Sequence, residues 1–150
     1  MIEESLIFPQ LKVENQQQLF EIIVNKMLEK GYVKKGFFEA LCEREKAYPT
    51  GLQINGIGFA IPHTDPQHVN ETKIAVTTLE TPVKFADMTN PNNLFDVELV
   101  FVLGTGGQDK HIDMLQNLME LFQNTDQCKE LLLLRDKAKI IQMLADSGIE

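Results

Sequence analysis

Hydrophobic residues recur at helical spacing in two stretches near the start of the chain. In residues 15–30, apolar side chains fall every three or four positions, and the pattern stops at Gly31, where a glycine often ends a helix. Residues 34–46 repeat the pattern, with Phe37 and Leu41 on one side, and it ends before the turn formers around Pro49. The spacing predicts two consecutive amphipathic helices.

Three short segments in the middle of the chain follow the patterns of β-strands. Residues 58–61 are apolar, residues 72–79 alternate in polarity, and residues 97–103 are almost continuously apolar, as is typical of a central strand buried on both faces. Between the last two segments, Asn90-Pro91-Asn92-Asn93 is dense in turn-forming residues. We expect a surface connection there.

Helical spacing returns in the last third of the chain. It follows the glycine-rich segment 104–107, with Leu115, Leu118 and Phe122 on one face, and it resumes around Ile140 after a predicted N-cap at Asp136. Helices on both sides of a short-stranded sheet follow from this order. We therefore expect an α/β fold, although the pattern does not give the strand order.

Composition indicates one domain and narrows the choice of partners. A chain of 150 residues with 43% hydrophobic residues can bury one sizeable core, so we expect a single domain over residues 1–150. No secretory leader is expected, and no apolar run approaches the roughly 18 residues that cross a bilayer. The net charge of −8 disfavours binding to nucleic acid and favours binding to a partner protein with a basic surface. Only Cys42 and Cys128 are present, which fits a reducing compartment.

Two of the three histidines follow predicted strands. His63 comes directly after the apolar run that ends at Pro62, and His111 lies beyond the glycine-rich segment, near the start of the next helix. If the two strands are parallel, both imidazoles reach the carboxyl edge of one sheet, where open α/β folds usually place their sites. A neutral imidazole is a competent nucleophile near pH 7, so His63 alone can accept and return a phosphoryl group.

His111 and Arg44 are the other candidates. At a helix start, free N–H groups favour a nearby phosphate, so His111 can hydrogen-bond to phosphoryl oxygens; a structural bond to a loop carbonyl is the alternative. Arg44 lies in the second predicted helix and can face a phosphate or a partner's carboxylate; a solvated charge at a helix end is the alternative.

Two other chemistries are weighed and set aside. His63, Asp65 and His68 offer metal-ligand types, but their spacing is not that of a helical zinc motif, and Pro66 lies among them, so no metal site is expected. The segment Gly104-Thr105-Gly106-Gly107 lacks the Lys-Ser/Thr ending of a nucleotide-binding loop, and we interpret it as a flexible turn. No cofactor is expected.

The stretch Asn55-Gly-Ile-Gly-Phe-Ala-Ile-Pro-His63 resembles the active-site signature of the enzyme IIA proteins of the bacterial sugar phosphotransferase system, in their fructose/mannitol class. Arg44-Glu45 upstream and His111 followed by Leu115-x-x-Leu118-Met119 downstream extend the resemblance over nearly the whole chain. Many members of the class have a glycine after the active histidine, whereas this chain has Thr64-Asp65-Pro66, which is similar to the galactitol-type branch.

The resemblance implies a cytoplasmic phosphocarrier domain with a mixed β-sheet flanked by α-helices on both sides. It implies that His63 accepts a phosphoryl group from the phosphocarrier protein HPr, with Nε2 as the reacting nitrogen, and passes it to a cysteine of an enzyme IIB partner that serves a membrane enzyme IIC. It further implies that His111 positions the phosphoryl group and that Arg44 supports the site surface. The transported sugar or polyol is recognised by the membrane subunit.

Two other functions stay open at this point. The first is a regulatory domain whose phosphorylation at His63 controls a binding partner without onward transfer. The second is a plain interaction module with structural histidines, which predicts no phosphoryl uptake.

Overall fold

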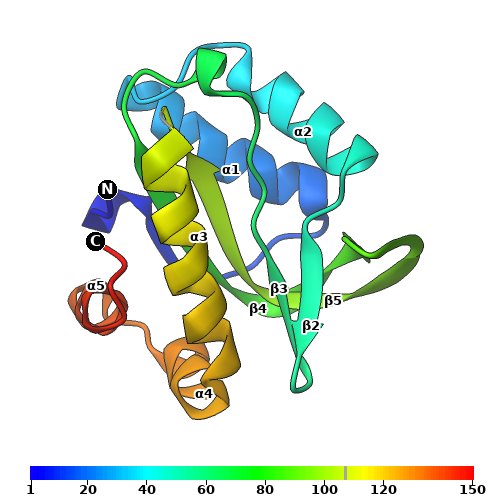
Figure 1. Cartoon of the computed structure of the whole chain (residues 1–150), viewed down its shortest axis with the longest axis vertical. Coiled ribbons are helices and arrows are strands. Elements are labelled where there is room, and N and C mark those ends of the chain that lie inside the picture. Colours follow the sequence, from blue (N-terminus) through cyan, green and yellow to red (C-terminus); the bar gives the residue numbers. More distant parts are fainter. Residues whose placement is uncertain (107) are drawn as a thin grey trace.

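Two long antiparallel strands, β4 (Lys73–Asp87) and β5 (Asn90–Gly104), form the centre of the sheet in the computed structural model (Figure 1). The structure describes residues 1–106 and 108–150, except for the side chains of residues 108–111. Ile74 to Thr78 of β4 pair with Leu103 to Leu99 of β5, and the pairing resumes beyond a register shift at Val83 and Val97. Beyond the register shift, Phe85 and Phe95 still pack in the core beneath α1 and α2, and only the tip of the hairpin projects from the rest of the sheet (Figure 1).

The other three strands add to the central hairpin. β1 (Ile7–Leu11) pairs with β4 in parallel, and β3 (Ile57–Ala60) pairs with β5 in parallel. β2 (Gly51–Ile54) runs antiparallel to β3 and also meets the outer half of β4, where Gly51 pairs with Asp87. The sheet is therefore mixed, as the family resemblance implied.

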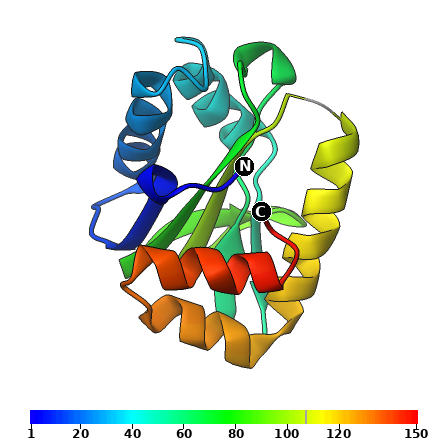
Figure 2. The same ribbon diagram turned by 90° about the vertical axis from the view of Figure 1, so that its left-hand side faces the viewer.

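Helices cover both faces of the sheet. α1 (Gln16–Glu29) and α2 (Phe37–Ala47) pack on one face, and α3 (Gln108–Gln123), α4 (Thr125–Leu133) and α5 (Lys137–Asp146) cover the other (Figure 2). A 3₁₀ turn, η1 (Glu4–Leu6), precedes β1. The predicted α/β class, with helices on both sides, is confirmed.

Alternation along β5 explains how one strand serves both helical layers. Val100 and Val102 belong to the core beneath α1 and α2, whereas Leu99, Phe101 and Leu103 belong to the core beneath α3, α4 and α5. All five are fully buried, and each such side chain contributes about 1.5–3 kcal/mol relative to an exposed one. The prediction of a central strand over residues 97–103 is confirmed.

Helix boundaries agree with the two predicted signals, the glycine stop at Gly31 and the N-cap at Asp136. Asn15 caps α1 by accepting from the backbone N–H of Gln18, and Gly31, with φ of +77°, lies just beyond its end. Asp136 caps α5, as predicted. α2 begins at Phe37 and not at Lys34 as predicted; Gly36 is its N-cap, and the N–H of Lys34 donates to the carbonyl of His68 in another loop.

One connection was predicted in the wrong place, and three elements were not predicted. Asn90–Asn93 is the exposed start of β5, and the turn lies at Met88 and Thr89, where the N–H of Thr89 donates to Asp87. Residues 90–94 are exposed, and this part of β5 is held to β4 by backbone pairing, so it can form a strand from polar residues. β1 and β2 span only five and four residues, and α4 begins two residues after the end of α3, so their apolar positions were too few in a row to be read as separate elements.

Candidate active site at the carboxyl edge of β3 and β5

His63 lies at the edge of the sheet where two parallel strands end. It forms a parallel bridge with Leu103, and the N–H of Leu103 donates to the carbonyl of Pro62 over 2.9 Å. β3 and β5 therefore end side by side, which meets the condition on which the sequence argument depended. His111 lies in the first turn of α3, which follows β5, but its side chain is outside the described residues.

The imidazole of His63 is held by a nearby carbonyl. Its Nδ1 lies 2.8 Å from the carbonyl oxygen of Ile61, and the side chain is half-buried. A carbonyl oxygen can only accept, so this contact requires the proton on Nδ1. In the neutral ring the lone pair then lies on Nε2, which makes Nε2 the nucleophilic nitrogen.

Ile61 is in turn tied to a buried carboxyl group. Its N–H donates to Thr50 Oγ1 over 3.2 Å, and the Thr50 hydroxyl and N–H donate to the two carboxyl oxygens of Glu45 over 2.6 and 2.7 Å. Glu45 is only 4% exposed. Burial raises its pKa from 4.5 to about 7, and the hydrogen bonds from Thr50 oppose part of that rise.

Arg44 precedes Glu45 in the last turn of α2, and its side chain is half-buried. Its guanidinium lies 4.8 Å from the ring centroid of Tyr48, a cation–π contact on a ring that is 66% exposed. Because Glu45 points inward to Thr50, the end of α2 that carries Arg44 lies against the end of β3. The structure therefore brings Arg44 to the same end of the sheet as His63.

The segment that follows His63 is clamped to the connection between α1 and α2. Val33 and Val69 form an antiparallel bridge, and the N–H of Lys34 donates to the carbonyl of His68. A Cβ on Gly36 would lie 3.0 Å from His68 Nδ1, so the two loops are in close contact. Within the part of the chain that the structure describes, no group of three or more metal-ligand residues comes together, around Asp65 and His68 or elsewhere.

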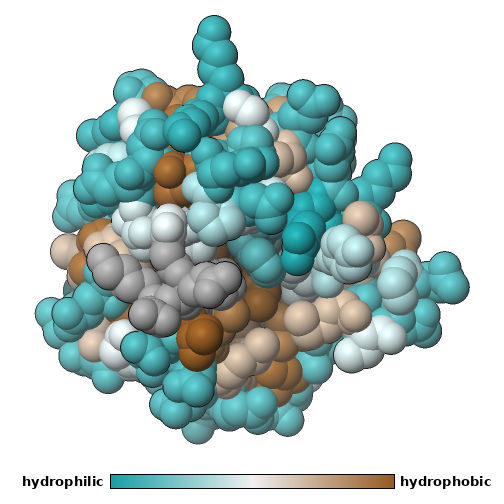
Figure 3. Space-filling view, turned by 45° about the horizontal axis from the view of Figure 1, so that its top comes forward, coloured by the Kyte–Doolittle hydropathy of each residue, from teal (hydrophilic) through white to brown (hydrophobic). Residues whose placement is uncertain are grey.

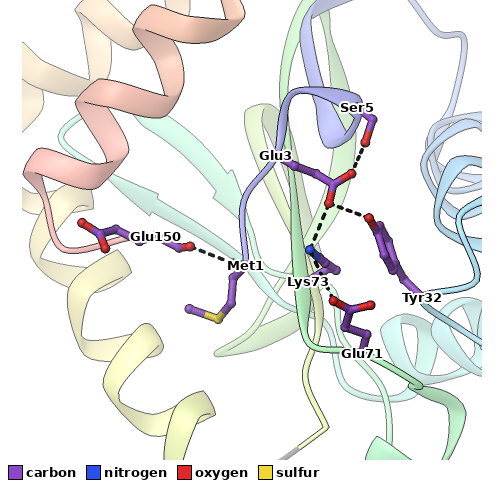
Figure 4. A network of polar contacts seen from close by, with 7 residues as sticks. All are labelled: Met1, Glu3, Ser5, Tyr32, Glu71, Lys73 and Glu150. Carbon is purple, nitrogen blue, oxygen red and sulfur yellow. Dashed lines mark hydrogen bonds and ion pairs between the residues drawn. The ribbon is translucent and has the colours of Figure 1, made fainter.

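A network of charges anchors this clamp (Figure 4). Glu3 accepts from the Tyr32 hydroxyl over 2.6 Å, from the Lys73 ammonium over 2.9 Å and from the Ser5 hydroxyl. These hydrogen bonds, with that of Ser5 foremost, lower the pKa of Glu3 to about 2. Tyr32 also accepts the N–H groups of Asn70 and Glu71 at its carbonyl, so the network holds the loop that returns from His63 to β4.

Part of the molecular surface is apolar. Figure 3 shows apolar side chains gathered beside the residues drawn in grey. Ile112, the residue after His111, is 56% exposed. A separate groove of about 730 Å³ lies between α1, α2 and the outer hairpin, and His63 is not among its lining residues. None of the described helices is long and apolar enough to cross a membrane.

Sequence reasoning assigned no role to Glu45 or Thr50. One signal pointed to Glu45: it continues the buried stripe of α2 that contains Phe37 and Leu41, each four positions from the next. A carboxylate on a buried stripe is unusual and marks a position for inspection. Thr50 carried no such signal, since its hydroxyl meets Glu45 only through the turn after α2.

The chain matches one family model over almost its whole length, and it is similar to several known proteins. Residues 1–147 match the family model described as "Phosphoenolpyruvate-dependent sugar phosphotransferase system, EIIA 2". The chain is 30% identical over 112 residues to the galactitol-specific EIIA component of the phosphotransferase system of Escherichia coli (strain K12), covering 75% of this chain and 74% of that protein. It is also 31% identical over 105 residues to the transcriptional regulator ManR of Bacillus subtilis (strain 168), a match that spans 70% of this chain and 15% of the regulator.

Solved structures share the fold. The crystal structure of IIA mannitol from Escherichia coli superposes with a TM-score of 0.78 at 18% identity, over 96% of this chain and 99% of that one. The IIA chain in a complex with phosphorylated enzyme IIB, also from Escherichia coli, superposes with a TM-score of 0.79 at 18% identity, over 97% and 98% of the two chains. With the family match running from residue 1 to residue 147, the chain belongs to the EIIA type 2 family of the phosphoenolpyruvate-dependent sugar phosphotransferase system.

Proposed function

We propose that His63 is a transient phosphoryl carrier that takes a phosphoryl group from phosphorylated HPr and passes it to a cysteine of an enzyme IIB partner. The observation that carries this proposal is the contact of His63 Nδ1 with the carbonyl of Ile61, at the shared end of β3 and β5. This contact directs the lone pair of Nε2 toward an incoming phosphorus atom. The whole of residues 1–150 acts as one carrier domain.

The transfer needs no bound cofactor. In the first step Nε2 attacks phosphorus, a new N–P bond forms, and the bond from phosphorus to the donor breaks. In the second step the partner's thiolate attacks, an S–P bond forms, and the N–P bond to His63 breaks, which returns the neutral ring. Both steps depend on positioning and on charge stabilisation more than on proton transfer.

His111 and Arg44 have supporting roles in this proposal. The first turn of α3 follows the end of β5, and backbone N–H groups at a helix start favour the phosphoryl oxygens. We assign to His111 a hydrogen bond to those oxygens and to Arg44 a contact with the partner or the phosphoryl group. The half-buried guanidinium at the end of α2 supports the second assignment.

The partners follow from the same proposal. Donor and acceptor proteins must reach His63 in turn, and the exposed apolar side chain of Ile112 in α3 suits such transient contacts. Enzyme IIB would serve a membrane enzyme IIC, while this chain stays in the cytoplasm. The similarity to a galactitol-specific component supports a polyol as the transported compound.

Phosphoryl uptake from phosphoenolpyruvate through purified enzyme I and HPr tests the proposal. The natural chain is expected to gain one acid-labile phosphate by intact mass, and a folded His63→Ala variant none. His68→Ala is the matched control, because it removes a half-buried imidazole five residues away and is expected to keep uptake. No uptake by the natural chain with active controls, or uptake by His63→Ala, would refute the carrier role.

A second candidate function is supported by the match to the regulator ManR, whose matched region is a small part of a longer protein. In that case phosphorylation of His63 would control a binding partner. Onward transfer to an enzyme IIB cysteine, with phosphorylation of the sugar, supports the transport carrier. A complex that depends on phosphorylation, without onward transfer, supports the regulator.

A further inference from the structure

We infer that Glu45 and Thr50 are positioning residues for His63, acting through the backbone of Ile61. The inference rests on the proposed role of His63 as phosphoryl acceptor and adds two residues to its site. Neither residue touches the reacting nitrogen. Their effect is on the orientation and the tautomer of the imidazole.

A continuous chain of hydrogen bonds links the carboxyl group of Glu45 to the ring of His63. The Thr50 hydroxyl donates to Glu45 Oε1 over 2.6 Å, the N–H of Ile61 donates to Thr50 Oγ1 over 3.2 Å, and His63 Nδ1 lies 2.8 Å from the Ile61 carbonyl. Glu45, Thr50 and Ile61 are each no more than 4% exposed, so water has little access to these groups even though Glu45 borders the groove beside α2.

The carboxyl group sets the direction in which the Thr50 hydroxyl points its proton. A hydroxyl has a single proton, and that of Thr50 is donated in a hydrogen bond to Glu45. The lone pairs of Thr50 Oγ1 are therefore left to accept from the N–H of Ile61. The backbone N–H of Thr50 also donates to Glu45, which fixes the carboxyl plane. Without an acceptor at position 45, the Thr50 hydroxyl can turn and release the N–H of Ile61.

Holding Ile61 matters because its carbonyl selects the tautomer of His63. Pro62 follows directly, and it restricts Ile61 to extended conformations and brings no N–H of its own. The N–H of Ile61 is therefore the donor that fixes the position of this residue, through its hydrogen bond to Thr50 just before β2. A shift of even part of an ångström in the Ile61 carbonyl weakens the bond that keeps the proton on Nδ1 and off Nε2.

A purely structural role accounts poorly for a carboxyl group at this position. Burying an ionisable group is costly, and the neighbouring positions of the same stripe, Phe37 and Leu41, are filled by apolar side chains. An apolar residue at position 45 would pack against the same core. Thr50 likewise presents to Ile61 a hydroxyl that valine, of nearly the same shape, would not supply.

The test combines a tautomer measurement with transfer kinetics in three variants. Thr50→Val removes the hydroxyl at nearly constant shape, Thr50→Ser keeps it, and Glu45→Gln keeps the shape of residue 45 but removes one acceptor. With ¹⁵N-labelled histidine, we expect the neutral ring of His63 in the natural chain to carry its proton on Nδ1. Thr50→Val and Glu45→Gln are expected to mix the two tautomers and to slow uptake from phosphorylated HPr roughly 10-fold. Thr50→Ser is expected to restore both readouts.

The outcomes separate this inference from the proposed function. A natural chain with the proton of His63 on Nε2, or a folded Thr50→Val or Glu45→Gln variant with unchanged tautomer and uptake rate, would overturn the positioning role. The carrier role is decided separately, by uptake in the natural chain and in His63→Ala. Absence of uptake in the natural chain would overturn the carrier role instead. If Thr50→Val does not fold, as judged by circular dichroism, the natural chain and Glu45→Gln still decide the matter.

Discussion

The carboxyl group of Glu45 makes the stability of this protein depend on pH near neutrality. Burial raises its pKa from 4.5 to about 7, so the folded state holds this proton more tightly than the unfolded chain does. The resulting stabilisation is complete below about pH 4.5 and is lost as pH rises to about 7. Above pH 7 the contribution of Glu45 to the free energy of unfolding no longer changes with pH. The total decrease from low pH is about 3 kcal/mol.

Urea unfolding at several pH values between 4.5 and 8 measures this loss in the natural chain and in Glu45→Gln. We expect the free energy of unfolding of the natural chain to fall across this range relative to that of the variant. The difference between the two chains isolates Glu45 from other titrating groups. If the free energies of unfolding of the two chains followed parallel curves against pH, the pKa of Glu45 would be the same in the folded and unfolded states.

Single residues also show how far sequence reasoning reached. His63 was chosen as a candidate because an imidazole directly after an apolar run and a proline is a distinctive local pattern. Glu45 and Thr50 were given no role because their hydrogen bonds to one another and to Ile61 link three segments of the chain. Local patterns report helix faces, but they do not report which turn brings a hydroxyl to a carboxylate.

At the scale of elements, close approach of β3 to the hairpin places His63. A Cβ built on Gly58 of β3 would lie 2.0 Å from the carbonyl oxygen of Asp96 in β5, well inside contact distance. A glycine at this position therefore lets β3 pair with β5. Only with that pairing does His63 lie opposite Leu103.

Gly58→Ala is expected to lower the free energy of unfolding by roughly 3 kcal/mol, because backbone atoms must move to admit the methyl group. Chemical denaturation measures the change. Gly106→Ala is the control, since its Cβ would meet Thr72 Oγ1 at an ordinary 3.5 Å, and we expect a change of less than about 1 kcal/mol. Equal stability of Gly58→Ala and the natural chain would show that the strands can separate without cost.

The elements that were predicted and those that were missed differ in how they are stabilised. α1 and the inner part of β5 have strong apolar patterns, because packing on the core stabilises them. The tip of the hairpin is held by backbone pairs such as Ala86 with Leu94, and its side chains from Asn90 to Leu94 are exposed, whereas the next pair, Phe85 with Phe95, is buried. Backbone pairing leaves little trace in a hydrophobic pattern, so Asn90–Asn93 was interpreted as a turn.

At the scale of the whole molecule, the site and the bulk of the C-terminal helices lie at opposite ends. The segment with η2 (Pro66–His68) is at one end in both ribbon views, and α4 is at the other (Figures 1 and 2). The chain carries a net charge of −8, and Asp65 is exposed two residues after His63. If HPr is the donor, as proposed, the exposed carboxylate of Asp65 and the net negative charge of the chain would attract a basic donor surface and raise the rate of encounter.

This attraction predicts that the second-order rate of phosphoryl uptake from HPr falls at least about 3-fold between roughly 0.05 and 0.5 M salt, since the screening length shrinks from beyond about 10 Å to a few ångströms. Uptake reactions at limiting HPr concentration, quenched at set times and analysed for phosphorylated chain, measure this rate. Asp65→Asn is expected to lower the low-salt rate and its salt dependence, whereas Glu130→Gln, an equal charge change on exposed α4, leaves both nearly unchanged. Equal effects of the two substitutions would mean that net charge, and not charge beside His63, guides the donor. A rate that does not respond to salt would remove electrostatic attraction from the encounter, and the apolar surface beside α3 would then have to provide it.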